Sequence, residues 1–288
     1  MNILITGVTR NNSKYLFSEY EKLKKIFYKF NKVQFLLIES DSNDDTLLQL
    51  KLINKIDNNF DYISLGNLEN SIPKRTERIA FCRNKYLEQI EIDEKYKDIN
   101  YVMVYDWDNI NKKRFFKNIY NIINQNYKWD AIFPNQTIAY YDLWALRNEK
   151  IKIDIWEFYR KIRHKKNYFC SHFIMHRRFH FKINKSYKWI PVNSAFGGFG
   201  IYKRSVITQS RYIGVNKKGD EICEHVRFNK NLRNKGYKLY IIPNLINSSI
   251  NQHSIKQIKI YLFIYLILEL LGTKFREYLF KKKIISYI

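Results

Sequence analysis

Cysteine is scarce in this chain of 288 residues, and its few copies stand far apart. The three cysteines are Cys82, Cys170 and Cys223, so the sequence contains no Cys-x-x-Cys pair and no even-numbered cysteine framework. This spacing argues against a disulfide scaffold and against a zinc site built from cysteines. Reduced thiols fit best, and we therefore expect a cytoplasmic protein.

Glycine is also sparse, with nine copies. Gly7 follows the first apolar segment without a second and third glycine, so the Gly-x-Gly-x-x-Gly fingerprint of a dinucleotide site is missing. We expect Gly7 to open a tight turn. Three of the nine glycines fall at positions 197, 198 and 200, which is more than a hairpin needs. Glycines let the backbone approach a ligand closely, so this loop is a candidate binding element.

No apolar run is long enough to cross a bilayer. The longest, residues 261–271, has about a dozen residues and contains Glu269, whereas a membrane-spanning helix needs roughly 20. The first residues read as a strand and lack the basic start, apolar core and cleavage site of a signal peptide. Basic residues such as Lys281 follow the apolar run. The tail is therefore expected either to pack on the body of the protein or to lie on an anionic membrane surface as a basic amphipathic helix.

Hydrophobic residues make up 45% of the chain and aromatic residues 17%, which indicates a folded globular protein of one large domain or two small ones. The formal net charge is +24, which favours anionic partners such as nucleotide phosphates, acidic membranes or nucleic acid. A bias toward AT-rich codons explains part of the same charge, and both readings stay open. The aromatic and basic segment 150–188 has no regular repeat, so we do not expect a nucleic-acid surface there.

Strands and helices are predicted to alternate along the chain. The spacing of apolar residues predicts strands over 3–6, 33–38, 60–65, 101–105, 129–134 and 237–243, and helices over 15–30, 47–56, 75–90, 112–124 and 221–236. An exposed loop is expected after residue 243. This order predicts an α/β fold with helices on the faces of a sheet, and ligands at the carboxyl ends of its strands.

The apolar strand 101–105 runs into two carboxylates, Asp106 and Asp108. Residues i and i+2 of an extended chain point to the same side, so both carboxylates could face one hard cation. Mg²⁺ or Mn²⁺ is commonly held by one or two carboxylates together with substrate phosphates. The alternative is a strand that simply ends in a polar turn.

Taken in order, several short motifs resemble the nucleotide-sugar glycosyltransferases of the GT-A fold, and among them the capsule-associated α-1,3-mannosyltransferase group and its relatives. The matching segments are Thr9-Arg10-Asn11, the Glu-x-x-Ser-x-Asp-x-Thr-like stretch 39–46, Arg78 to Asn84, Asp106 with Asp108, the Tyr-Asp-x-Trp-x-x-Arg segment 141–147, the glycine-rich loop 196–200, Glu224-His225 and Pro243-Asn244. The likeness spans roughly residues 1–253. Those mannosyltransferases often carry a single-aspartate motif where this chain has Asp-x-Asp, so the resemblance does not identify the sugar.

The resemblance implies a Rossmann-type mixed sheet flanked by helices over residues 1–254, with a helical tail over 255–288 that is the candidate membrane contact. It implies a metal-dependent hexosyltransferase that moves a sugar from a nucleoside-diphosphate sugar to a hydroxyl of a glycan, lipid or protein. Mn²⁺ or Mg²⁺ would be the cofactor. The implied metal ligands are Asp106, Asp108 and His253.

The resemblance also assigns roles around the donor and the acceptor. Glu224 would act as acid or base near the acceptor if the reaction inverts the anomeric carbon, with Asp108 as the second catalytic residue. His225 would orient its neighbours, and the Gly197-Gly198 loop would hold sugar or acceptor. The other substrate-binding residues implied are Thr9, Arg10, Glu39, Arg78, Arg83, Asn84, Asp106, Tyr141 and Asp142.

Two other classes remain as alternatives. A phosphatase or phosphotransferase of the dehalogenase type also places Asp-x-Asp after an apolar strand, although usually near the start of the chain and with Thr or Val where Ile110 stands here. A non-catalytic basic module that docks on membrane or nucleic acid is the third reading.

Overall fold

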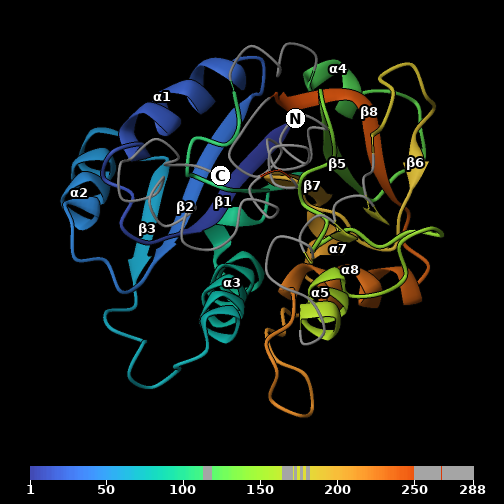
Figure 1. The fold of residues 1–288 in the computed structure, drawn as a ribbon. Coiled ribbons are helices and arrows are strands. Elements are labelled where there is room, and N and C mark those ends of the chain that lie inside the picture. Colours follow the sequence, from blue (N-terminus) through green and yellow to red (C-terminus); the bar gives the residue numbers. More distant parts are fainter. Residues whose placement is uncertain are drawn as a thin grey trace.

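The computed structural model describes residues 1–112, 119–163 and 182–249, together with residues 171, 174, 175, 178, 179 and 267. A mixed eight-stranded sheet runs through this part of the chain, in the order β3-β2-β1-β4-β7-β5-β8-β6 (Figure 1). The strands are β1 Asn2–Thr9, β2 Lys32–Glu39, β3 Phe60–Ser64, β4 Tyr101–Tyr105, β5 Ala131–Gln136, β6 Ile190–Pro191, β7 Phe199–Lys203 and β8 Leu239–Ser248. The α/β prediction is confirmed.

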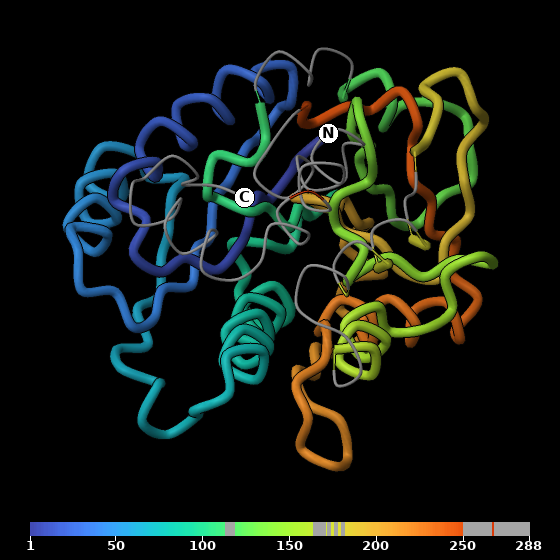
Figure 2. The backbone as a smooth tube through the Cα atoms, in the orientation of Figure 1, coloured from blue at the N-terminus to red at the C-terminus, as the bar shows by residue number. Residues whose placement is uncertain are grey.

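The sheet is parallel on one side and mixed on the other. Strands β3, β2, β1 and β4 are all parallel, so their carboxyl ends meet at one edge. Strand β7 pairs antiparallel with β4 and with β5, and brings the glycine-rich loop at its start next to the end of β4. Figure 2 shows the blue N-terminal half and the green-to-orange C-terminal half side by side along this sheet.

Helices cover both faces of the sheet and bury two apolar cores. One face carries α1 Leu16–Ile26, α2 Thr46–Ile56 and α4 Ile119–Ile123, and the other carries α3 Arg75–Ile92, α5 Ile155–Arg163, α7 Arg204–Ile207 and α8 Glu224–Asn234. Alternate residues of the strands face the two cores, as in Ile3 and Leu4 of β1, and both are fully buried. A short 3-10 turn, Glu94–Tyr96, leads from α3 into β4.

Several local predictions differ from the structure. Gly7 lies inside β1 and opens no turn: a Cβ at this position would stand 2.3 Å from the backbone oxygen of Tyr105. Glycine is therefore needed for the close approach of this strand to its neighbours. Helix α1 ends at Ile26, four residues before the predicted end. Strand β8 continues past Pro243 to Ser248, where a loop was expected, because the register with β5 shifts there and the proline needs no ladder hydrogen bond.

Candidate functional site

A cleft of about 880 Å³ opens at the carboxyl ends of β1, β2 and β4. Its walls come from the loops after these strands, the first half of α3, residues 141–144, the start of α5 and the start of α8. Ligands of open α/β sheets bind at this edge, because the connecting loops there are free to vary without disturbing the sheet.

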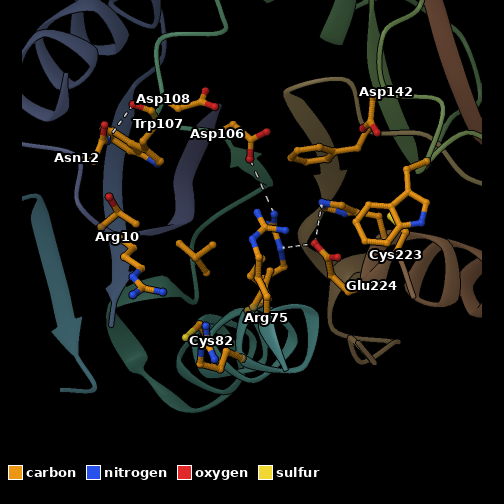
Figure 3. Close-up of a pocket in the computed structure, with 18 of the residues that line it drawn as sticks. Arg10, Asn12, Arg75, Cys82, Asp106, Trp107, Asp108, Asp142, Cys223 and Glu224 are labelled. Atoms are coloured by element: carbon orange, nitrogen blue, oxygen red, sulfur yellow. Dashed lines mark hydrogen bonds and ion pairs between the residues drawn. The ribbon is translucent and has the colours of Figure 1, made fainter. Parts of the chain in front are cut away.

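Asp106 and Asp108, which flank the buried Trp107 in sequence, both line the cleft (Figure 3). The backbone N–H of Asp106 donates to the carbonyl of Gly198 at 2.9 Å, which fixes the first carboxylate just beyond β4. Trp107 is 2% exposed and packs edge-on against Phe35 in the core, whereas Asp108 is exposed. Because successive residues of an extended chain point to opposite sides, the inward-facing Trp107 leaves the carboxylates of Asp106 and Asp108 facing the cleft.

Repulsion between carboxylates marks this corner of the cleft. Burial raises the pKa of Asp106 well above its usual range, and the neighbouring charges of Asp108 and Asp142 raise it further. The Asp106 side chain nevertheless keeps 36% of its surface accessible. A cation placed here would relieve the repulsion. The corner is therefore suited to a positively charged ligand.

Arg83 links this corner to α8. Its Nε lies 3.2 Å from Oε1 of Glu224, and one Nη lies 3.8 Å from Oδ1 of Asp106. The Arg83 side chain is 5% exposed and that of Glu224 is 8% exposed, so the pair is buried. The guanidinium also lies over the ring of Phe196, with 5.4 Å to its centroid. One buried cation thus holds carboxylates from two sides of the cleft.

His225 stands beside this pair as a neutral ring. Burial lowers the pKa of His225 well below its usual value, and the charge of Arg83 lowers it further. The ring stacks on Phe196 with centroids 3.8 Å apart, and its Nε2 lies 3.6 Å from Oε1 of Glu224, too far for a hydrogen bond. Among the described residues neither ring nitrogen has a hydrogen-bond partner.

Arg10 and Arg78 line the cleft on its other side, where protein groups engage both of them. Arg10 donates to Glu69 at 2.9 Å, and its Nε donates to the backbone oxygen of Asp41 at 3.2 Å. Arg78 pairs with the same Glu69 at 3.2 Å and donates to the carbonyls of Ile72 and Pro73. The two arginines therefore tie together the loops that follow β1, β2 and β3.

Thr9, Tyr141 and Asp142 complete the predicted residues that line the cleft. Asp142 accepts hydrogen bonds from the backbone N–H groups of Gly197, at 2.9 Å, and of Ala145, at 3.2 Å. Burial raises the pKa of Tyr141, and the charge of Asp106 raises it further. Asp142 thereby joins segment 141–145 to the glycine-rich loop.

Four predicted residues lie outside the set that lines the cleft: Glu39, Asn84, Gly197 and Gly198. Glu39 is 1% exposed and accepts hydrogen bonds from Ser42 and Ser64, so it organises the end of β2. Asn84 exchanges two hydrogen bonds with the backbone of Tyr212, which fastens α3 to the segment before α8. The two glycines lie behind Asp106 as structural neighbours.

Several residues that line the cleft were given no individual role by the sequence prediction. They are Asn12, Lys14, Arg75, Trp107, Trp144, Trp156 and Phe196. Arg75 begins the helix on which Arg78 and Arg83 were singled out, so its position could have been used as a signal. Trp156 belongs to α5, in the segment 150–188 to which no element was assigned.

The predicted third metal ligand, His253, lies outside the described residues. Within the part of the chain that the structure describes, no three His, Cys, Asp or Glu side chains form a metal-holding group. Two carboxylates at a strand end still fit a hard cation, because Mg²⁺ and Mn²⁺ sites in nucleotide enzymes often take only one or two from the protein. The donor set, oxygen atoms of Asp106 and Asp108, suits such a cation.

The chain is similar to known proteins in structure, but no similarity in sequence is found. No model of a known protein family matches the chain, and no curated protein gives a significant sequence match. The crystal structure of residues 1–349 of TarS from S. aureus is similar over 88% of this chain, with a TM-score of 0.50 and 13% identity. The mannosyltransferase PcManGT from Pyrobaculum calidifontis, solved with GDP-Man and Mn²⁺, matches over 88% with a TM-score of 0.50 and 11% identity.

The chain has the GT-A fold. It covers 61% of the TarS fragment and 62% of PcManGT, so it spans about three fifths of the length of these proteins. In this GT-A fold the cleft, Asp106 and Asp108 lie at the edge where the parallel strands end. In the described residues, no helix combines the length and apolar character that a membrane span requires.

Proposed function

We propose that this protein is a glycosyltransferase that moves a sugar from a nucleoside-diphosphate sugar to a hydroxyl acceptor, with a divalent cation at Asp106 and Asp108. The observation that carries the proposal is the carboxylate pair at the end of β4, inside a cleft large enough for a nucleotide sugar. The GT-A fold, and the GDP-Man and Mn²⁺ with which PcManGT was solved, support the donor class.

The donor side of the cleft combines the two carboxylates with basic side chains. Thr9, Arg10 and Arg78 stand near the ends of β1 and β2, and Arg75 is exposed at the start of α3. The departing group of a glycosyl donor is a nucleoside diphosphate, whose developing charge needs compensation. A bound Mg²⁺ or Mn²⁺ supplies this by neutralising the phosphate oxygens. Arg83 holds Asp106 on the side away from solvent.

His253 is proposed as a third ligand of the cation. Strand β8 ends at Ser248, and its Asn247 accepts a hydrogen bond from the backbone N–H of Lys112 at 2.8 Å, so the described chain ends close to the loop that carries Asp106 and Asp108. His253 follows four residues after the last described residue of this segment, Ser249.

Glu224 is proposed to act on the acceptor side. It is the first residue of α8 and lines the cleft opposite the ends of β1 and β2. Its carboxylate pairs with Arg83 at 3.2 Å, and a carboxylate in this place can accept a hydrogen bond or a proton from an acceptor hydroxyl. His225 is neutral and stacked, which suits an orienting role.

A donor panel tests the proposal. Purified protein is incubated with UDP-sugars and GDP-sugars, with Mn²⁺ or with EDTA, and release of the nucleoside diphosphate is measured. The proposal expects release from one donor class only when Mn²⁺ is present. Release of inorganic phosphate from a phosphomonoester instead would support the dehalogenase-type alternative. Binding of plain RNA with no donor turnover would support the non-catalytic one.

The tail is proposed to bring the enzyme to a membrane surface. Apart from Ile267, residues 250–288 lie outside the described residues, so the division at residue 254 rests on sequence alone. The support is the apolar run 261–271 followed by basic residues, among them Lys281, Lys282 and Lys283. The acceptor proposed for the transfer is a hydroxyl of a glycan, a lipid or a protein.

A further inference from the structure

Three fully buried side-chain amides meet behind the loop that carries Asp106 and Asp108. We call residues 106–112 the aspartate loop and the three amides the amide cluster: Asn111, Gln136 and Asn247. Their exposed fractions are 0%, 1% and 0%. They come from the aspartate loop itself, from the end of β5 and from the end of β8. Polar groups buried this deeply persist in proteins when their hydrogen bonds are satisfied.

The cluster joins the aspartate loop to the glycine-rich loop. Asn111 donates from Nδ2 to the carbonyls of Asp106, at 3.2 Å, and of Gly198, at 3.1 Å. Asn247 donates from Nδ2 to Oδ1 of Asn111, at 2.6 Å, and to the carbonyl of Gly197, at 2.7 Å. Gln136 donates from Nε2 to Oδ1 of Asn247, at 2.9 Å.

The hydrogen bonds to backbone carbonyls fix which way the side-chain amides of Asn111 and Asn247 are turned. A backbone carbonyl only accepts hydrogen bonds, so the nitrogen of Asn247 has to face Gly197, and that of Asn111 has to face Asp106 and Gly198. Asn111 also packs closely against the glycine-rich loop, because a Cβ at Gly198, whose φ is 102°, would stand 2.8 Å from Oδ1 of Asn111. The backbone of Asn111 is held as well, because Lys22 of α1 donates to its carbonyl at 2.6 Å.

We propose that the amide cluster positions Asp106 and Asp108, and thereby sets the affinity of the cleft for a divalent cation. This inference rests on the proposed function. The cluster holds the aspartate loop at both ends, through the hydrogen bond to the carbonyl of Asp106 and through the side chain of Asn111. Asp108 lies between these two residues. Losing hydrogen-bond partners that orient metal ligands typically lowers metal affinity about 10- to 100-fold. Asn111, Gln136 and Asn247 are thus positioning residues that touch neither cation nor donor.

The test measures Mn²⁺ affinity directly, by electron paramagnetic resonance of free Mn²⁺ in the presence of UDP or GDP. Asn111→Ala is expected to raise the Mn²⁺ dissociation constant about tenfold or more. The matched control is Asn229→Ala, because Asn229 is also 0% exposed and its Nδ2 donates to the carbonyl of Ala195 at 3.0 Å, away from the aspartate loop. Both variants lose a buried amide, so thermal stability should fall similarly in both.

The outcomes separate this inference from the proposed function. If Asn111→Ala binds Mn²⁺ no more weakly than Asn229→Ala does, the amide cluster is only structural and the inference is wrong. If the wild-type protein binds no Mn²⁺ with either nucleotide, the metal site itself is refuted and the inference falls with it. Should Asn111→Ala fail to fold, Gln136→Leu decides by the same comparison, with a smaller rise expected because it removes only the outer end of the cluster.

Discussion

Replacement of Arg83 by methionine should destabilise the fold strongly, because it leaves a carboxylate buried without its cation. Arg83 and Glu224 are 5% and 8% exposed, and 3.2 Å separates Nε from Oε1. Removal of one partner from a buried ion pair costs about 3–5 kcal/mol. That is a large share of the roughly 5–15 kcal/mol by which proteins are stable. Arg211→Met, which breaks a partly exposed pair with Glu91, should cost about 1 kcal/mol or less.

The double variant shows whether the buried charge is the cause. In a Glu224→Gln background no carboxylate is left unpaired at α8, so Arg83→Met should cost about 2 kcal/mol less than it does in the wild type, within the range seen for contacting residues. The free energy of unfolding is measured by urea denaturation, followed by tryptophan fluorescence and circular dichroism. If the double variant is destabilised by the sum of the two single substitutions to within about 0.5 kcal/mol, the two residues act independently and the reasoning is wrong.

Three further predictions concern the loops, the acceptor side and the tail. Burial acts to raise the pKa of Asp44, but hydrogen bonds from Thr46 and Ser13 lower it to about 2. The ionised side chain should therefore stabilise the fold above about pH 4, and this stabilisation should disappear as the pH falls toward 2. If the free energy of unfolding of Asp44→Asn changes with pH in parallel with that of the wild type across this window, the prediction is wrong. Glu224→Gln should lower turnover far more than donor affinity, and a collapse of donor affinity with surviving turnover would show that the role is misassigned. Truncation at residue 254 should abolish the salt-sensitive co-sedimentation of the protein with anionic liposomes, because each basic residue near such a surface contributes about 1 kcal/mol. Equal sedimentation of the full and truncated proteins, or a truncated protein that cannot fold, would favour a tail that packs on the domain.

The sequence was sufficient to predict the parallel half of the sheet. Its strands are apolar runs of ordinary length separated by helices of clear periodicity, and β2, β3 and β4 agree with the predicted ranges to within one residue at each end. Strand β7 was missed because its start is dense in glycine, which reads as a loop. Strand β6 has two residues and gives no pattern. The end of β8 was missed because Pro243 and the polar Asn244 and Asn247 interrupt its apolar character.

The site could be predicted only as far as strand ends and helix starts locate residues. Asp106, Asp108 and Glu224 reach one cleft because the first two follow a parallel strand and the third begins a helix beside it. Their partners are another matter. Arg83 and Glu224 are 141 residues apart in sequence, and Asn111 and Asn247 are 136 apart. No local spacing reveals such pairs, because the fold of the sheet brings them together.

The central claim is that Asp106 and Asp108 hold the cation for a nucleotide-sugar donor. The most direct measurement compares Mn²⁺-dependent release of nucleoside diphosphate by the wild type, by Asp108→Ala and by Asp98→Ala, whose exposed carboxylate lies far from the cleft in a pair with Lys32. We expect release by the wild type and by Asp98→Ala, and loss of release in Asp108→Ala with an unchanged circular dichroism spectrum. Full release by Asp108→Ala, or by the wild type in excess EDTA, would contradict the claim.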